Sequence, residues 1–315
     1  MINFSQHINF FIKHSLDIII VNWNSCDLLR TCLNSLFESD LSSITLNVIV
    51  VDNNSSDNSE KYPYPTYSTL IRSGNNLGFG KACNLAYLQC KSEYILLLNP
   101  DTVLQPNTLN DLFQKVNSYP DYAIYGIQQR DMKGNVLRTC GRFPSLYNIL
   151  MDSSGLSKFF PSLFVPAPLM IDWNHLETRE VDHVMGSFML ITKDIIDENI
   201  LFDDSYFMYF EDLDLSYRVR KKGYKSLFLS DPYIIHEAGG TSRKVLDKRL
   251  FYSLHSKIVF QFIHHGKFTA ILTFLIIFLI ELPIRLISKC YSLNQMGIIL
   301  SAYKMLLNNL VSIFK

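Results

Sequence analysis

The chain has 315 residues, enough for one large domain or two ordinary domains with a substantial core. Its 29 basic and 29 acidic side chains balance, so no overall field recruits nucleic acid, and we expect no nucleic-acid partner. The six cysteines lack CxxC spacing, which predicts reduced thiols in the cytoplasm rather than a metal cluster. The apolar patch INFFI near the N-terminus lacks the small-residue cleavage site of a signal peptide, so we expect the catalytic part to face the cytoplasm.

The first 120 residues alternate between strand and helix patterns. Four apolar runs are predicted to be strands: LDIIIVNW, LNVIVVD, YSTLIR and YILLL. Apolar residues at helical spacing predict three helices: SCDLLRTCLNSLFES with Ser25 as its N-cap, GKACNLAYLQC, and PNTLNDLFQKVNSYP with Pro106 in its first turn. This alternation predicts an α/β fold with a mostly parallel, doubly wound sheet and helices on both faces.

Polar residues lie at or just beyond the ends of the predicted strands, at Asn22, Asp52, Asn75 and Asp101. In open α/β sheets, ligands bind at the carboxyl ends of the strands. Asn and Asp are also ordinary turn residues, so any one of these loops can be a simple turn. Taken together, the loops indicate a small-molecule site, with a nucleotide as the first candidate.

Two common nucleotide-binding folds do not fit these loops. A dehydrogenase needs a glycine fingerprint directly after the first strand, where this chain has NWNSCD. Its glycine-containing loop, GNNLGFG, follows the third strand instead. The phosphate-binding sequence GxxxxGK[ST] is also absent. We therefore expect neither a nicotinamide-binding domain nor a P-loop nucleoside triphosphatase.

Seven motifs in chain order resemble those of the family-2 glycosyltransferases, in particular the rhamnosyltransferase-like branch: IIIVNWNS, VVDNNSSDN, NNLGFGKACN, LLLNPDT, VMGSFMLITKD, FDDSYFMYFEDLDLSYRVRKKGYK and IIHEAGGTS. The resemblance implies a GT-A-type fold that transfers a sugar from a nucleotide donor with inversion, usually with a divalent cation. It also implies four parts of the chain: an N-terminal extension (1–15), a Rossmann-like nucleotide-sugar-binding half (16–120), an acceptor-binding and catalytic half (121–244), and a C-terminal helical region (245–315).

The NPDT motif is where this family places its metal-binding Asp-x-Asp signature. Here Asn99 takes the first position, and Asp101 is the carboxylate. Mg²⁺ or Mn²⁺ beside a diphosphate is commonly held by one or two carboxylates together with the phosphates, and acts as a Lewis acid. His236 matches a histidine that can complete the metal site in related enzymes. An ordinary Asn-Pro-Asp turn and a structural histidine are the alternatives.

The resemblance also assigns substrate contacts. Asp52 corresponds to an acidic residue that recognises the base and ribose, although a turn or capping role is the alternative. The loop with Asn75 and Gly78 corresponds to one that closes over the nucleoside, or is simply a turn before a helix. The predicted substrate-binding residues are Asn22, Asp52, Asn75, Gly78, Asn99, Gly186, Ser187 and Arg243.

The stretch FEDLDLSYRVRKKG places three acids, Glu211, Asp212 and Asp214, before a helical pattern that ends at Gly223. Acids at the start and bases at the end suit the helix dipole, which is a complete structural explanation. The resemblance implies more, because the family's Glu-Asp motif supplies the catalytic base. That base is Asp212 here, with Glu211 as the substitute, and it takes the proton of the attacking hydroxyl. We expect Asp214 and Arg218 to be structural, with Asp214 at an exposed helix start.

The C-terminal region is unusually apolar. From Phe268 to Ile280 there is no charge, but these 13 residues fall short of the roughly 20 that a spanning helix needs. Basic residues flank the run, which suits anionic lipid. A marginal span, an in-plane membrane anchor and a buried helix of a homo-oligomer all remain open, and we favour the in-plane anchor.

Together, these features predict a metal-dependent inverting hexosyltransferase on the cytoplasmic face of the bacterial inner membrane. It moves a sugar, with rhamnose as the best guess, from a nucleoside diphosphate donor of the dTDP or UDP type. The acceptor is a hydroxyl of a growing, lipid-linked cell-surface polysaccharide. The alternatives are an inactive glycan-binding or scaffolding member of the fold, and a nucleotidyltransferase, which does not predict the FEDLDLSYR and HEAGGTS motifs.

Overall fold

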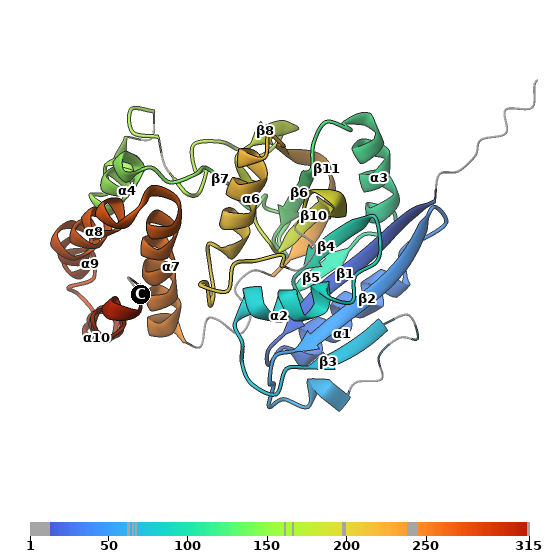
Figure 1. Ribbon diagram of the computed structural model, residues 1–315, viewed down its shortest axis with the longest axis horizontal. Coiled ribbons are helices and arrows are strands. Elements are labelled where there is room, and N and C mark those ends of the chain that lie inside the picture. Colours follow the sequence, from blue (N-terminus) through green and yellow to red (C-terminus); the bar gives the residue numbers. More distant parts are fainter. Residues whose placement is uncertain are drawn as a thin grey trace, which may run out of the picture.

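The computed structural model describes residues 13–313, apart from 62–63, 65, 67, 161, 166, 197–199 and 238–244. The strands of its main sheet are β1 (His14–Asn22), β2 (Ile44–Asp52), β3 (Ser68–Arg72), β4 (Tyr94–Leu98), β5 (Thr102–Leu104), β6 (Ile124–Arg130), β8 (Arg179–Val181), β10 (Phe188–Thr192) and β11 (Ser226–His236). Their order is β3–β2–β1–β4–β10–β6–β11–β5, with β8 beside β11 (Figure 1). Two short strands, β7 (Cys140–Gly141) and β9 (His183–Val184), pair with each other.

Helices cover both faces of this sheet. α1 (Cys26–Phe37) and α3 (Thr108–Ser118) pack on one face, and α2 (Phe79–Tyr87) and α6 (Glu211–Lys221) pack on the other. Because successive side chains of a strand point to opposite faces, β1 buries Ile18 under the first pair of helices and Ile19 under the second. The predicted α/β fold with a doubly covered sheet is confirmed.

The strands do not all run in one direction. β1 is parallel to β2 and β4, and β2 is parallel to β3, as the alternating pattern predicts. β10 is antiparallel to both of its neighbours, β4 and β6. Its start therefore lies beside the end of β4, with Phe188 opposite Leu98. This reversal brings Gly186 and Ser187, which precede β10, next to the loop that carries Asn99.

The predicted N-cap position of Ser25 is confirmed, and the predicted place of Pro106 needs correction. Ser25 occupies the N-cap of α1, but its hydroxyl donates to Asn22 Oδ1 (2.7 Å) instead of accepting from the helix. Asp57 Oδ2, from the loop after β2, accepts the first backbone N–H of the helix (2.8 Å) and takes over the capping. α3 begins at Thr108, so Pro106 lies before the helix rather than in its first turn.

The C-terminal region forms a helical bundle beside the sheet, on the left of Figure 1. Its elements are α7 (Leu246–His265), α8 (Lys267–Ile276), the π-helical turn η4 (Ile277–Glu281), α9 (Leu282–Ser288), α10 (Leu293–Asn308) and α11 (Leu310–Ile313). α4 (Leu146–Ser153), which is followed by α5 (Leu156–Phe159), packs against α8. Leu213 of α6 joins the core of this bundle, so α6 is held between the sheet and the C-terminal helices.

α8, η4 and α9 form one continuous helix, Lys267–Ser288, whose most apolar window of 18 residues has a mean hydropathy of 2.4. Within the described residues, it is the one helix that is long and apolar enough to cross a membrane. Only 22% of its apolar window is buried. Four buried residues at helical spacing, Ala270, Thr273, Ile277 and Glu281, mark the face that packs on the protein. The helix also exposes six large apolar side chains: Phe268, Ile271, Leu275, Leu279, Ile284 and Ile287.

Glu281 fastens this helix to the bundle. Its buried carboxylate lies 3.4 Å from Lys257 Nζ of α7 and 2.6 Å from a guanidinium nitrogen of Arg285. It also accepts a hydrogen bond from Ser153 Oγ of α4 (3.0 Å). Pulling the helix away would leave a buried charge unpaired, which is strongly destabilising.

Candidate active site

β1 and β2 end side by side, with Asn22 and Asp52 in register and both buried. The Asn22 amide donates to Asp52 Oδ1 (3.2 Å) and to Ser59 Oγ (2.7 Å), and its oxygen accepts from Ser25. The Asp52 carboxylate also accepts from the backbone N–H of Ser55 (3.2 Å), while the single proton of Ser59 Oγ goes to the closer Asp57 Oδ1 (2.6 Å). The Asp52 carboxylate therefore has room for a further donor. Asn22 therefore positions Asp52.

The loop after β3 closes against the end of β2. Asn53, which the sequence did not single out among the turn residues of DNNSSD, donates to the Gly78 carbonyl (3.1 Å) and accepts from the Leu77 N–H (2.9 Å). Gly78 has a φ of +81°, and a Cβ there would lie 2.0 Å from the carbonyl oxygen of Phe207. A glycine is thus required at position 78, because the backbone there lies too close to the backbone of Phe207 for any side chain. Asn75 of the same loop is exposed.

Asp101 and His236 face each other at the edge of the sheet. Asp101 lies directly before β5, and His236 ends the antiparallel neighbour β11. Asp101 Oδ1 lies 3.2 Å from His236 Nε2, with side chains only 9% and 10% exposed. Neither atom has a hydrogen-bond partner among the described residues. Two ligand atoms about 2.1 Å from one cation, at a right angle, would be about 3 Å apart, so this pair fits a divalent ion.

Gln129 of β6 supports this pair and was missed by sequence reasoning. Its Oε1 lies 2.6 Å from His236 Nδ1, which fixes the ring proton on Nδ1 and leaves the Nε2 lone pair facing Asp101. Gln129 Nε2 donates to Ser187 Oγ (2.9 Å), and the Ser187 carbonyl accepts the Asn99 N–H (3.0 Å). Among the described residues, no group of three or more His, Cys, Asp or Glu side chains could hold a metal. A cation here would need further ligands from the substrate.

Asp212, the second residue of α6, approaches the same place from the other side. Its Oδ2 accepts the Gly186 N–H at 2.8 Å, and its side chain is 19% exposed. Gly186 directly precedes Ser187, so adjacent residues contact the Asp212 carboxylate and the surroundings of the Asp101–His236 pair. Gly186 and Ser187 thus link the predicted base to Gln129, the support of the predicted metal ligand His236.

His183 of β9 is a second residue that sequence reasoning missed. Its Nε2 lies 3.7 Å from Asp212 Oδ2, and its Nδ1 lies 3.0 Å from Ser216 Oγ. Ser216 Oγ in turn donates to the Asp212 carbonyl (3.0 Å). Burial lowers the pKa of His183, although the charge of Asp212 opposes this effect. A neutral imidazole therefore holds the first turn of α6 in place.

Glu211 lies next to the predicted base but in a different environment. It is buried, and its Oε2 has no hydrogen-bond partner among the described residues. Burial first, and the charge of Asp212 second, raise the pKa of Glu211 to about 8. A carboxyl group that keeps its proton at neutral pH cannot accept one, which favours Asp212 over Glu211 as the base.

Glu211→Gln should remove a pH dependence of stability. Between pH 4.5 and about 8, native Glu211 holds a proton that the unfolded chain has released, so the free energy of unfolding falls as the pH rises. Each pH unit in this window costs on the order of 1.4 kcal/mol. Glutamine cannot titrate, so the free energy of unfolding of the variant, relative to that of the wild type, should rise toward pH 8. Urea unfolding from pH 5 to 9 tests this, and parallel curves for the two proteins would contradict it.

Asp214 is not the exposed helix-start acid that the sequence predicted. It is fully buried, because α7 packs over α6. His264 Nε2 of α7 lies 2.6 Å from its Oδ1, and Arg218 Nε lies 2.8 Å from its Oδ2. Arg218 also donates to the Leu201 carbonyl (2.7 Å). Asp214 therefore joins α6 to α7 of the C-terminal bundle through His264, and Arg218 joins it to the loop at Leu201.

Asp214→Asn should destabilise the protein by about 3 kcal/mol or more, because removing one partner of a buried ion pair leaves the others uncompensated. The measurement is the free energy of urea unfolding at pH 7. Asp203→Asn, in the exposed turn before α6, is the matched control and should differ little from the wild type. If Asp214→Asn lowered the free energy of unfolding no more than the control does, Asp214 would act only through its favourable interaction with the helix dipole.

Arg243, predicted to reach the donor phosphates, lies outside the described residues, as does the GGTS loop before it. Its role stays a prediction.

The chain is similar in sequence to known glycosyltransferases. An N-acetylglucosaminyl-diphospho-decaprenol L-rhamnosyltransferase of Mycobacterium tuberculosis is 27% identical over 244 residues, 71% of this chain and 78% of its own. Rhamnosyltransferase WbbL of Escherichia coli is 26% identical over 205 residues, 61% of this chain and 72% of its own. Both are rhamnosyltransferases by name.

Solved structures show the same GT-A fold at low identity. The mannosyltransferase PcManGT from Pyrobaculum calidifontis, in complex with GDP-Man and Mn²⁺, has a TM-score of 0.53 at 13% identity, covering 94% of this chain and 87% of its own. S. aureus TarS 1–349 in complex with UDP-GlcNAc has a TM-score of 0.54 at 16% identity, and the match covers 91% of this chain and 79% of the TarS chain. Residues 17–200, more than half of the chain, match the family described as Glycosyl transferase family 2. The protein is therefore a member of glycosyltransferase family 2, with sequence similarity to rhamnosyltransferases.

Proposed function

We propose that this glycosyltransferase moves a sugar, with rhamnose as the first candidate, from a dTDP- or UDP-linked donor to a hydroxyl of a lipid-linked polysaccharide, with inversion. The dipeptide Gly186–Ser187 carries the proposal, because it contacts the Asp212 carboxylate on one side and the support of the Asp101–His236 pair on the other. Single displacement needs a proton acceptor and a diphosphate site close together.

On the donor side, Asp101 and His236 would hold Mg²⁺ or Mn²⁺ together with the donor diphosphate. When bound, the cation would supply Lewis-acid stabilisation of the departing diphosphate. Imidazole suits Mn²⁺ better than Mg²⁺, and Gln129 keeps His236 in the ligating tautomer. Asp52, at the end of β2, would accept a hydrogen bond from an N–H of the pyrimidine ring.

On the acceptor side, Asp212 would take the proton of the attacking hydroxyl. The acceptor oxygen forms its bond to the anomeric carbon as the bond to the diphosphate oxygen breaks. The electron pair leaves with the nucleoside diphosphate, and the proton stays on Asp212. The Gly186 N–H fixes the orientation of this carboxylate. Because one displacement occurs, no second carboxylate is needed as a nucleophile.

A lipid-linked acceptor requires a site at a membrane. We place the protein on the cytoplasmic face of a bacterial inner membrane, with helix Lys267–Ser288 lying in the plane of the leaflet. Two features favour an in-plane helix rather than a helix that crosses the membrane. The helix has an exposed apolar side, and Glu281 attaches it to α4 and α7.

The test combines the purified protein with Mn²⁺, a panel of dTDP- and UDP-sugars, and a polyprenyl-diphosphate N-acetylglucosamine acceptor. We expect a new glycoside with inverted anomeric configuration, read by NMR. Retention of configuration would overturn the mechanism. An inert protein that still binds glycan would instead support the scaffolding alternative, and pyrophosphate release from a nucleoside triphosphate would support a nucleotidyltransferase.

A further inference from the structure

Exposed apolar side chains gather in two segments far apart in the sequence. Of the 24 exposed large apolar residues among the described part of the chain, five lie in 146–165 and eight in 267–293. The first segment includes Phe159 and Leu163, which are 75% and 69% exposed. The second includes Leu279 and Ile287, at 70% and 72%. Exposed apolar patches of this kind mark interaction surfaces.

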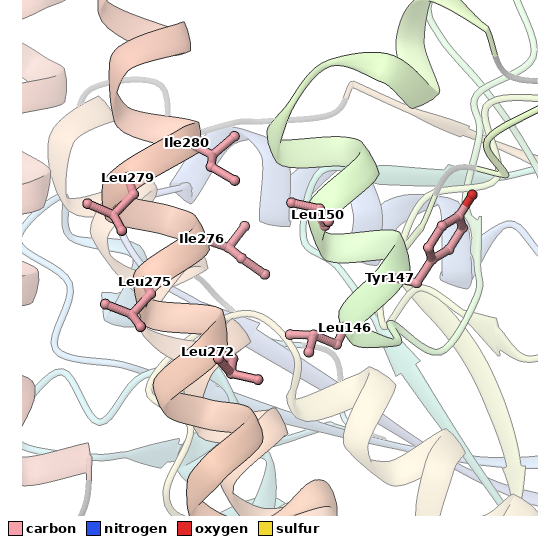
Figure 2. A pocket seen from close by; sticks show the side chains of 8 residues that line it. All are labelled: Leu146, Tyr147, Leu150, Leu272, Leu275, Ile276, Leu279 and Ile280. Carbon is pink, nitrogen blue, oxygen red and sulfur yellow. The ribbon is translucent and has the colours of Figure 1, made fainter.

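The two segments meet at one groove. α4 packs against α8 and η4, and the groove between them has a volume of about 440 Å³. Figure 2 shows its walls, with Leu146 and Leu150 of α4 facing Ile276 and Ile280 of the continuous helix. All of its lining residues are leucine, isoleucine or tyrosine. A groove with this lining fits a hydrocarbon chain.

The charges around this surface have one sign. Residues 143–171 contain one acid, Asp152, and residues 267–293 contain one, Glu281. Neither is exposed: Asp152 accepts from Ser157 Oγ and from the Ala167 N–H, and Glu281 is buried in its ion pairs. The same ranges carry four basic residues, Lys158, Lys267, Arg285 and Lys289, of which Arg285 is paired with Glu281. The surface therefore complements an anionic partner.

We propose that α4–α5 and helix Lys267–Ser288 form one two-part membrane-docking face that binds an anionic lipid leaflet, with the groove between them taking a lipid chain. The proposal deepens the membrane association in the proposed function and adds α4–α5 to it. A second copy of this chain is a poorer occupant, because a two-fold interface would place basic side chains against basic side chains.

The test is flotation of the full chain with vesicles of phosphatidylcholine alone or with one quarter phosphatidylglycerol. Wild type should bind the anionic vesicles more tightly. Phe159→Glu/Leu163→Glu and Leu279→Glu/Ile287→Glu should each weaken this binding by at least about tenfold, because each removes two apolar side chains from the lipid and adds two negative charges. Leu88→Glu/Met132→Glu, at exposed apolar positions elsewhere, is the matched control and should bind like wild type.

Insertion of a chain into the groove has its own readout. Leu275→Trp places an indole among the groove-lining residues, and lipid brominated along its acyl chains should quench the added fluorescence. Lack of quenching on bound vesicles would overturn the groove assignment.

Three results would overturn the proposal: wild type that stays with the soluble fraction, a Phe159→Glu/Leu163→Glu variant that binds like wild type, or a dimer in solution that the double variants dissociate. Thermal melting of each variant confirms that it is folded. Donor hydrolysis without lipid is measured in parallel, so that a failed docking face and a failed glycosyltransferase assignment give different results.

Discussion

Asp212→Asn should lower the rate of sugar transfer by roughly 10²- to 10⁴-fold, the usual contribution of a positioned general base. Asparagine keeps the shape of the side chain, and its oxygen can still accept the Gly186 N–H that holds Asp212 Oδ2. The first turn of α6 should therefore stay in place. What the variant loses is the ability to bind the proton of the attacking hydroxyl. Transfer rate, donor affinity and thermal midpoint are the measurements.

Donor binding provides the internal control, because Asp52 and the Asp101–His236 pair belong to other elements and should be unaffected. Glu211→Gln should retain most of its activity, since a protonated Glu211 already cannot act as the base. If Glu211→Gln were as inactive as Asp212→Asn, while both variants kept their thermal midpoint, the base would have been assigned to the wrong carboxyl group.

Local patterns were enough to predict much of this molecule. The buried runs of β1, β2 and β4 and the helices between them follow from composition and spacing, and the strand-end residues follow from the geometry of parallel sheets. The direction of β10 could not be predicted, because the apolar run FMLIT is equally compatible with either direction. Yet this direction places Gly186 and Ser187 beside the end of β4.

The missed residues share a physical cause. Gln129 lies in an ordinary strand, and its importance comes from His236, 107 residues away. His183 becomes a support of α6 only through Ser216 and Asp212. Asp214 was assigned to an exposed helix start because its partner His264 lies 50 residues further along, on a helix whose packing the sequence does not reveal. Long-range polar contacts of this kind leave no local periodicity.

Asp101→Asn should abolish most of the metal-dependent binding of the donor. Its Oδ1 and the neighbouring His236 Nε2 are both buried without a hydrogen-bond partner in the described part of the chain, and the amide of asparagine is neutral and a weaker ligand. Lewis-acid stabilisation by a bound ion is worth several kcal/mol, so the loss in transfer should be at least about a hundredfold. Mn²⁺ binding in the presence of dTDP or UDP, followed by electron paramagnetic resonance, measures the site independently of turnover.

Two further variants make this result specific. Gln129→Ala leaves both ligands in place but frees the His236 ring, so it should weaken Mn²⁺ binding by about 10- to 100-fold. Asp121→Asn, at an exposed position before β6, removes a carboxylate without touching the site and should bind Mn²⁺ like wild type. The expected loss of Mn²⁺ binding therefore increases from the Asp121 variant to the Gln129 variant to the Asp101 variant. Asp121 lies away from the site, Gln129 contacts the ligand His236, and Asp101 is itself a ligand. If Asp101→Asn kept wild-type transfer rates with a chelator present, Asp101 would be a turn residue and the pair would not be a metal site.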